Sequence, residues 1–408
     1  MTKQIAILHY ASPPVVGGVE STIAYQARIL TDFGYSVRIV SGDGAPFDAR
    51  VETHIHPLFG SKHPDVLAIK AQLDKGVVPS EFDAFVAKQT QALEKALEGC
   101  AVCIAHNVPT FNKNLALSVA LSNMQSIRVL AWCHDLAWTN PQYLPELHEG
   151  YPWDVLKRVW AHAHYVTVSE PRRLELAEML DISPDAISVI TPGVDSARFF
   201  HWTETTRQIE ASLNLLDADG ILLLPARLTR RKNIALGLLV LSVLREQTGQ
   251  DYRLIVTGPP GPHNPANPGY LAELLSLRES LGLQKAAHFL YELSDPPLIP
   301  DDDTMANLYQ LADALFFPSI QEGFGIPVLE AGLAGLPVFC SDIPPFRHMG
   351  RDDVTYFDPE HEAPEAIAAR ILARLENDPT SRLRRRSRRE YRWERIIRDR
   401  LLPLLELR

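Results

Sequence analysis

Two carboxylates and two glycines share one short segment, Glu322-Gly-Phe-Gly-Ile-Pro-Val-Leu-Glu330, which could bind an anion. The apolar run Ala314–Phe317 comes just before it, so the segment lies at the carboxyl end of a predicted strand. Gly323 and Gly325 let the backbone approach a ligand closely, and Pro327 suits the first position of a helix. The free N–H groups and the positive dipole end of that helix would face an anion such as a diphosphate.

The two carboxylates of this segment have different explanations. Glu330 is predicted in the first turn of the helix, where an acid that offsets the helix dipole is common. Glu322 lies in the preceding loop beside a glycine, where we find no structural task for it. Glu322 is therefore the stronger candidate for chemistry.

A basic segment, Arg227-Leu-Thr-Arg-Arg-Lys232, lies between a predicted strand, Ile221–Ala226, and a predicted helix, Asn233–Gln247. Alone, it could be a solvated turn. Beside a helix start at the same sheet edge, Arg227 and Lys232 would neutralise a leaving diphosphate.

Other familiar signatures are missing or have simpler explanations. The chain contains no Walker-type phosphate loop and no G-x-G-x-x-G after a strand. Asp301-Asp302-Asp303 could bind a metal, but it comes just before the predicted helix Thr304–Asp313, so helix capping is favoured. Cys100 and Cys103 could be a redox pair or half a metal site, but buried structural thiols are favoured. We predict no metal.

Composition limits the classes of protein that remain. The chain has 408 residues with 46% hydrophobic and 22% charged residues, which indicates a globular protein of two or more domains. A net charge of −10 argues against nucleic acid as a partner, and four cysteines make no disulfide framework. The N-terminus resembles a buried strand more than a signal peptide, and there is no apolar stretch of about 20 residues. We expect a cytoplasmic protein.

Short apolar runs alternate with helix-period stretches along most of the chain, which predicts parallel sheets with helices on both faces. The fold class is α/β, with two tandem Rossmann-like, doubly wound domains and a cleft at the strand ends. We predict an acceptor-side domain over 1–200, a donor-binding domain over 201–385 and a C-terminal helix over 386–408 that packs back on the first domain. The stretch Phe199–Asn214 is predicted as an irregular linker.

The end of the chain is unusually basic, with ten arginines and three acids between Arg382 and Arg400. One interpretation is a basic face for weak peripheral contact with an anionic membrane. The favoured one is a surface helix pair with solvated arginines, some of which join the C-terminus to the first domain.

Taken together, the motifs resemble the retaining glycosyltransferases of family 4 (glycosyl transferases group 1), which have the GT-B fold. The resemblance covers nearly the whole chain. Besides the two segments above, the matching motifs, in order, are Pro14-Val-Val-Gly-Gly-Val-Glu20, His134-Asp135, Val168-Ser169, Pro192-Gly-Val-Asp195 and Ser341-Asp-Ile-Pro344.

The resemblance implies a donor site and catalytic roles. Arg227 and Lys232 would bind the diphosphate as it leaves, Glu322 would orient hydroxyls of the transferred sugar, and His134 would lie near the anomeric centre. These four are the catalytic candidates. The remaining donor-binding candidates are Gly323, Phe324, Gly325 and Ile326 for sugar and phosphate, Glu330 for the ribose, and Gly17 and Gly18 for the phosphates.

Several residues of the first domain are weaker candidates for the acceptor. Glu20 follows the glycine pair, and His106-Asn107 follows the predicted strand Val102–Ala105. His106 could contact the acceptor or could be a hydrogen-bonded wall histidine. Trp138 and Tyr143 belong to an aromatic cluster that could stack on a sugar, although core packing explains at least half of that cluster.

The resemblance thus implies transfer of a hexosyl group from a UDP- or GDP-hexose to a hydroxyl-bearing acceptor, which could be a carbohydrate. The expected mechanism is front-face displacement with retention, without a metal or other cofactor. Alternatives are a nucleotide-sugar epimerase or a phosphorylase on the same fold, or a non-catalytic two-lobed sugar-binding protein.

Overall fold

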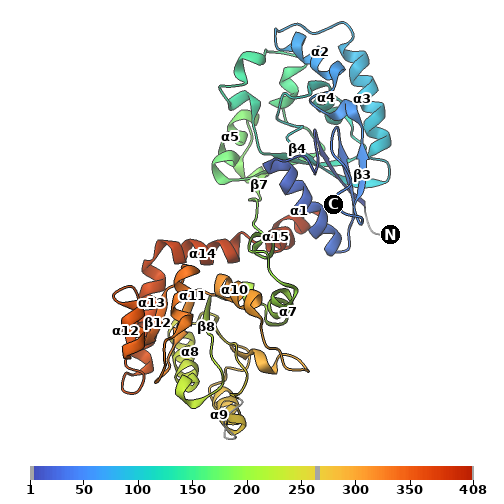
Figure 1. The fold of residues 1–408 in the computed structure, drawn as a ribbon. Coiled ribbons are helices and arrows are strands. Elements are labelled where there is room, and N and C mark those ends of the chain that lie inside the picture. Colours follow the sequence, from blue (N-terminus) through green and yellow to red (C-terminus); the bar gives the residue numbers. More distant parts are fainter. Residues whose placement is uncertain (1–3, 262–266, 407–408) are drawn as a thin grey trace. The chain divides into compact units, whose positions relative to one another are not determined.

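Two separate parallel sheets organise the chain, which we describe from a computed structural model covering residues 4–261 and 267–406 (Figure 1). Unit 1 runs to Gly193 and takes up the chain again from Trp393, and unit 2 is Val194–Arg392. In each unit the strand order places the first strand in the middle, with β3-β2-β1-β4-β5-β6-β7 in unit 1 and β10-β9-β8-β11-β12-β13 in unit 2. Both are Rossmann-type orders, and all the strand pairs are parallel.

The elements of unit 1 have the following bounds. The strands are β1 (Gln4–His9), β2 (Ser36–Ser41), β3 (Glu52–Ile55), β4 (Cys100–His106), β5 (Arg128–Cys133), β6 (Ala163–Thr167) and β7 (Ile187–Val189). The helices are α1 (Gly18–Asp32), α2 (Pro64–Leu73), α3 (Phe82–Ala96), α4 (Leu115–Asn123), α5 (Glu170–Leu180), α15 (Trp393–Ile396) and α16 (Leu402–Glu406), with a π-helical segment (Ile397–Leu401) between the last two. Short 3₁₀ helices are η1 (Pro57–Phe59), η2 (Ala137–Thr139), η3 (Leu144–Glu146), η4 (Trp153–Leu156) and η5 (Pro184–Ala186).

Unit 2 is built in the same way. The strands are β8 (Gly220–Leu224), β9 (Tyr252–Val256), β10 (Ala287–Phe289), β11 (Ala314–Phe317), β12 (Val338–Ser341) and β13 (Thr355–Phe357). The helices are α6 (Ser196–Phe199), α7 (Glu204–Leu213), α8 (Ile234–Thr248), α9 (Asn267–Ser280), α10 (Asp302–Leu311), α11 (Ile326–Leu333), α12 (Pro344–Gly350), α13 (Pro364–Asn377) and α14 (Pro379–Glu390), with short η6 (Leu215–Asp217), η7 (Arg230–Lys232) and η8 (Leu290–Glu292).

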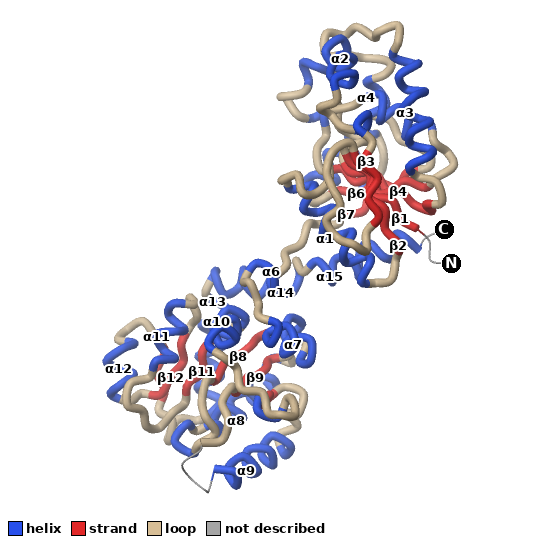
Figure 2. Tube along the Cα trace, turned by 45° about the vertical axis from the view of Figure 1, so that its right-hand side comes forward, coloured by secondary structure: helices blue, strands red, loops and turns tan. Residues whose placement is uncertain are grey.

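Helices cover both faces of the sheet in unit 1 (Figure 2). Along β1, Ile5 and Ile7 join the core beneath α1, whereas Ala6 and Leu8 join the core beneath α3 and α4. This alternation follows from the period of two along a strand. The C-terminal segment returns to the α1 face, where the Trp393 ring stacks on Tyr25 at 5.4 Å (Figure 1).

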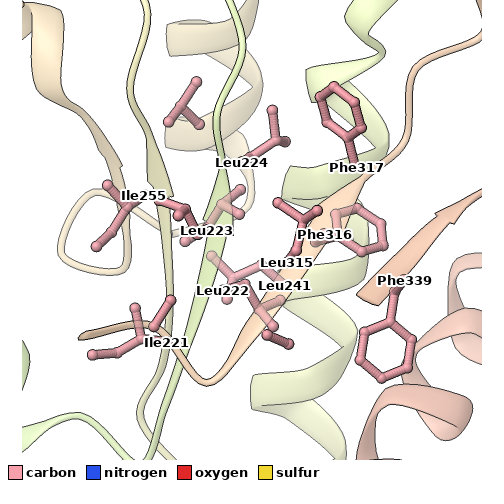
Figure 3. Close-up of a cluster of buried hydrophobic side chains, with 14 of the residues drawn as sticks. Ile221, Leu222, Leu223, Leu224, Leu241, Ile255, Leu315, Phe316, Phe317 and Phe339 are labelled. Carbon is pink, nitrogen blue, oxygen red and sulfur yellow. The ribbon is translucent and has the colours of Figure 1, made fainter. Parts of the chain in front are cut away.

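The core of unit 2 is built around two central strands that contain only apolar residues apart from one glycine. Leucines of β8 lie beside Leu315 and Phe316 of β11, and Leu241 of α8 packs on them (Figure 3). Every residue of β8 and β11 is buried, as expected for central strands of a sheet covered on both faces.

The structure confirms the predicted tandem Rossmann-like domains but corrects some elements. The sequence analysis did not predict β3, α2 or α3. The supposed irregular linker Phe199–Asn214 is largely helical, because α7 has an apolar face with Ile209 buried. Thr203 caps that helix by accepting a hydrogen bond from the Thr206 N–H. The chain passes between units after Gly193 and after Arg392, whereas the predicted boundaries were 200 and 385.

The arginines of α14 bind unit 2, whereas we had expected some of them to hold the C-terminus on the first domain. Arg388 pairs with Asp313 at 2.8 Å, and Arg389 pairs with Asp219 at 2.5 Å. Just after the helix, Arg392 pairs with Asp217 at 2.8 Å. These three arginines thus form ion pairs within unit 2. In residues 4–261 and 267–406, we find no helix both long and apolar enough to cross a membrane.

The two ambiguous motifs have ordinary structural roles. Asp301 caps α10 by accepting a hydrogen bond from the Thr304 N–H at 2.8 Å, as predicted. Cys103 is fully buried in β4 and Cys100 is half-buried, and neither forms a disulfide. Burial raises the pKa of both thiols, which makes them poor nucleophiles.

Candidate functional site

In unit 2, the loops that follow β8 and β11 lie side by side at one sheet edge. The two strands are neighbours in the sheet, and both loops leave from their carboxyl ends. The Ile320 N–H donates to the carbonyl of Arg231 at 2.9 Å, which ties the loops together. The two segments singled out in the sequence therefore form one site.

Glu322 is the centre of an ion cluster in this site. Lys232 and Arg231 both donate to its carboxylate, Arg231 at 3.0 Å, and Arg231 also donates to the carbonyl of Gln321 at 3.0 Å. The side chains of Lys232 and Glu322 are only 11% and 8% exposed, so little water screens their attraction.

The environment shifts the ionisation of both partners. Burial lowers the pKa of Lys232, and the hydrogen bond to Glu322 offsets only part of that effect. Burial by itself would raise the pKa of Glu322, but the contributions of Lys232, Ser319 and Arg231 together outweigh burial and lower that pKa. The carboxylate therefore stays ionised and holds the ammonium in place.

Arg227 lies in the same loop, directly beyond β8, with its side chain exposed. Its guanidinium makes no hydrogen bond or ion pair with any residue in the described part of the chain, although its carbonyl accepts a hydrogen bond from the Thr229 N–H at 2.8 Å. Close packing of Gly258 against Ala226 and Arg227 holds its backbone, because a Cβ on that glycine would lie 2.5 Å from the Ala226 carbonyl oxygen. Arg227 thus presents a fixed backbone and an uncommitted guanidinium.

Helix α11 begins beside this ion cluster. Gly325 is its N-cap, with φ of +101°, and Phe324 and Ile326 on either side are 52% and 58% exposed. Pro327 is the second helical residue, because the helix begins one residue earlier than predicted. Glu330 is consequently in the second turn and not in the first, and its carboxylate accepts a hydrogen bond from the Tyr309 hydroxyl at 2.6 Å.

We expect the two glycines of this loop to differ sharply in tolerance to alanine. A Cβ at Gly325 would lie 2.5 Å from Phe346 and would have to adopt a positive φ, whereas a Cβ at Gly323 would meet nothing within 4 Å. Gly325→Ala should therefore cost about 1–3 kcal/mol in stability, and Gly323→Ala should change it little. Urea unfolding of both variants checks this, and equal stability of the two would contradict it.

In unit 1, the glycine pair marks the start of α1. Gly18 is the first helical residue and Gly17 is its N-cap, in an extended conformation open to any residue. A Cβ at Gly17 would nevertheless lie 2.1 Å from a carboxylate oxygen of Glu20, which folds back over it. A side chain at this position would push that carboxylate, the flexible end of Glu20, away from its present place 4.0 Å from the His9 ring.

Asn107 holds the His134-Asp135 loop. It adopts a φ of +60° just after β4, a conformation that asparagine tolerates better than most residues. Its side-chain oxygen accepts hydrogen bonds from the N–H groups of His134 (2.9 Å) and Asp135 (3.0 Å), and its amide donates to the Asp135 carboxylate at 2.9 Å. Asn107 therefore supports the position of His134.

A chain of hydrogen bonds runs behind His134. Gln26 Oε1 lies 2.9 Å from His106 Nε2, and His106 Nδ1 lies 2.9 Å from His134 Nε2. An amide oxygen can only accept, so His106 donates from Nε2, and its Nδ1 accepts a hydrogen bond from the N–H at His134 Nε2. This arrangement leaves His134 Nδ1 as the nitrogen with a free lone pair.

His106 and His134, the two histidines of this hydrogen-bond network, are neutral. Burial holds the pKa of His106 well below its usual value, and burial lowers the pKa of His134 to about 3. Repulsion between protonated rings adds to both shifts, from His134 and His9 on His106 and from His9 on His134, and burial lowers the pKa of His9 as well. A neutral His134 can accept a hydrogen bond from a ligand hydroxyl near neutral pH.

These shifts make the stability of unit 1 sensitive to acid. A lowered pKa means that the unfolded chain takes up protons below about pH 6.5 that the folded unit excludes, so stability is complete above that pH and falls toward about pH 3. Between pH 7 and 5, His134 alone should account for about 2 kcal/mol of lost unfolding free energy. In urea unfolding, the free energy of unfolding of His134→Gln should fall by about 2 kcal/mol less than that of wild type between pH 7 and 5. His361→Gln, which replaces an exposed histidine, should show the same fall as wild type.

A cavity of about 380 Å³ opens at the carboxyl ends of β1, β2 and β4. Of the acceptor candidates, Glu20 and Asn107 line it. His106 is completely buried behind it, and the Tyr143 ring packs against Phe111 of its wall. Trp138 is held elsewhere, donating to the carbonyl of Trp153 and lying under the Lys157 ammonium.

Sequence reasoning did not identify several residues of these sites. Arg231 had been seen only as part of a basic run, and Tyr309, His9 and Gln26 carried no motif. Each is recognised only by its contact with a residue far away in the sequence. Among residues 4–261 and 267–406, no cluster of three or more His, Cys, Asp or Glu side chains is placed to hold a metal ion.

Two family models match the chain and together span most of it. The model "Glycosyltransferase Family 4" matches residues 16–198, and "Glycosyl transferases group 1" matches residues 205–392. The chain belongs to the family 4 glycosyltransferases. Its two tandem Rossmann-like domains form the GT-B fold, as the resemblance to this family implied.

The relatives named below are similar to this chain at low sequence identity. A D-inositol 3-phosphate glycosyltransferase of Salinispora tropica is 28% identical over 55% of this chain and 47% of its own length, so the match spans about half of that protein. A mannosylglucosylglycerate synthase of Thermotoga maritima is 24% identical over 84% of this chain and 83% of its own. A solved glycosyltransferase of Rickettsia africae aligns over the full length of both chains at 16% identity with a TM-score of 0.36, which adds nothing to the fold derived from the strand order.

Proposed function

We propose that this family 4 glycosyltransferase transfers a hexosyl group from a UDP- or GDP-hexose to a hydroxyl-bearing acceptor, with retention of anomeric configuration. The observation that carries the proposal is the ion cluster of Lys232, Glu322 and Arg231 beside the start of α11, in which the side chains of Lys232 and Glu322 are buried. Unit 2 would take the donor and unit 1 the acceptor.

The charges of the unit 2 site suit a diphosphate leaving group. Arg227, Arg231 and Lys232 bring three cations to the loop, and Glu322 neutralises only one of them. The N–H groups at the start of α11 add a positive dipole end. Negative charge that grows on phosphate oxygens as the anomeric bond breaks would be stabilised there without a metal.

Front-face displacement fits this set of groups. The acceptor hydroxyl would attack from the side on which the diphosphate leaves and would give its proton to a phosphate oxygen, so no separate base is required. Glu322, held as a carboxylate by Lys232 and Arg231, would accept hydrogen bonds from sugar hydroxyls. His134 Nδ1 would accept another near the anomeric centre, and the Glu330 carboxylate would bind the ribose.

The relatives suggest the class of acceptor. The two relatives above are named for D-inositol 3-phosphate and for mannosylglucosylglycerate, which are a polyol derivative and a glycoside. A small polyhydroxylated acceptor is therefore the class to test first.

Nucleotide release from UDP- and GDP-hexoses, with and without polyol and sugar acceptors, tests the proposal. We expect release that depends on an acceptor, a product with the anomeric configuration of the donor by NMR, and full activity in EDTA. A changed sugar nucleotide without acceptor would indicate an epimerase, and sugar phosphate formed from a glycoside and phosphate would indicate a phosphorylase. Binding without turnover would indicate a sugar-binding protein.

A further inference from the structure

The unit 1 cavity contains cations that the proposed reaction does not use. Its wall includes Glu20, Asp43, Lys62, His63 and Lys113. The cavity opens where β1, β2 and β4 end, which is where open α/β sheets bind ligands. Two lysines in a cavity of about 380 Å³ need an explanation.

Lys113 is held at the wall by aromatic rings and not by an acid. Its ammonium lies 5.2 Å from the ring centres of both Phe111 and Tyr143. The nearby carboxylate of Glu146 is bound instead by Lys70 at 2.7 Å and by Asn112 at 2.8 Å. Within the described residues, Lys113 has no carboxylate within 4 Å, so its charge is available to a ligand.

Lys62 comes to the same cavity from the loop after η1, and its side chain is exposed. Two contacts fix that loop beside Lys113 and Asp43. The Asn114 side chain donates to the carbonyl of Leu58 at 2.9 Å. Gly42 lies so close to Gly60 that a Cβ on it would be 1.8 Å from the Gly60 nitrogen. No ion pair of Lys62 is found in residues 4–261 and 267–406.

The carboxylates of Asp43 and Glu20 in the cavity wall can accept hydrogen bonds from a ligand. One oxygen of Asp43 accepts a hydrogen bond from the Gly44 N–H at 2.8 Å, and Glu20 lies 4.0 Å from the His9 ring. Burial lowers the pKa of His9, so that ring is neutral and leaves the Glu20 charge uncompensated. Carboxylates in this state accept hydrogen bonds from hydroxyl groups.

We propose that the cavity selects an acceptor that carries both hydroxyl groups and an anionic group, a phosphate or a carboxylate. Lys62 and Lys113 bind the anion, and Glu20 and Asp43 accept hydrogen bonds from the hydroxyls. The inference rests on the proposed function, whose acceptor it specifies. A neutral sugar can form only ordinary hydrogen bonds with the two ammonium groups, whereas an anion forms charge-assisted ones, which are stronger.

Calorimetry with matched probes tests this inference on the full chain, with excess UDP present to occupy the donor site. The pairs are glucose 6-phosphate and glucose, myo-inositol 1-phosphate and myo-inositol, and glycerate and glycerol. We expect at least one anionic probe to bind about tenfold or more tightly than its neutral partner. The pairs also separate phosphate from carboxylate as the preferred anion.

Variants locate the binding. Lys62→Ala and Lys113→Met should each weaken the anionic probe about tenfold and leave neutral probes unchanged. Methionine at 113 keeps an unbranched apolar stem over the two rings. Lys75→Ala, which removes an exposed lysine of unit 1 outside the cavity, is the matched control and should bind as wild type. Thermal unfolding of each variant excludes misfolding.

Two results would overturn the inference. One is equal binding of anionic and neutral probes, or no binding of any anionic probe. The other is an anion preference that survives in both lysine variants. Glu322→Gln separates this test from that of the proposed function, because it should abolish sugar transfer and leave anion binding in unit 1 intact.

Discussion

Replacement of Lys232 by alanine should lower the rate of sugar transfer by about 10²- to 10³-fold, the usual cost of one preorganised group that stabilises transition-state charge. The side chain is buried and already positioned by Glu322, so it needs no reorganisation when charge develops on the leaving phosphate. The rate of nucleotide release at saturating donor measures the loss of turnover. Calorimetry with UDP measures nucleotide affinity and so shows whether donor binding is weakened as well.

Arg230→Ala is the matched control for this prediction. Arg230 lies in the same basic turn, but its side chain is 64% exposed, pairs with Glu273 and lies over the Tyr270 ring. Its removal should change turnover only a few-fold. If Lys232→Ala folds and turns over at the wild-type rate, the donor-site assignment is wrong.

Arg388→Ala should destabilise unit 2 by about 3–5 kcal/mol, the usual effect of removing one partner from a buried ion pair. The side chains of Arg388 and Asp313 are 6% and 1% exposed. Arg388 also donates to the carbonyl of Ala218, and Asp313 accepts from the Ile221 N–H at the start of β8. The variant would leave the buried Asp313 carboxylate without the guanidinium that now neutralises it, next to the first residues of β8.

Amide hydrogen exchange of β8 and β11 in the full chain measures this effect in unit 2 itself, because two units need not unfold as one. Arg386→Ala, an exposed arginine of the same helix, is the control and should stay within about 0.5 kcal/mol of wild type. Equal protection in both variants would show that α14 is held by its other contacts.

Much of this protein could be predicted from local sequence. Short apolar runs such as Ala314–Phe317 are typical of buried strands, and their alternation with helix-period stretches predicts parallel sheets. Gly325 and Pro327 marked the start of α11 to within one residue. Segments with weaker patterns were missed. None of the residues of β3 is fully buried, and a strand of this kind needs no apolar run. Its sequence, Glu-Thr-His-Ile, therefore gave no signal for a strand.

Sequence by itself determined the two Rossmann-like domains, the family, and which residue types could bind a sugar diphosphate. Only the tertiary structure decided the partners: Glu322 with Lys232 from a loop 90 residues earlier, His134 with His106, and the arginines of α14 with unit 2. It also brought Lys62 and Lys113 to one cavity. The reason is physical. Local patterns record how each segment buries its own apolar face, whereas the partner of a polar group depends on which strands become neighbours in the sheet.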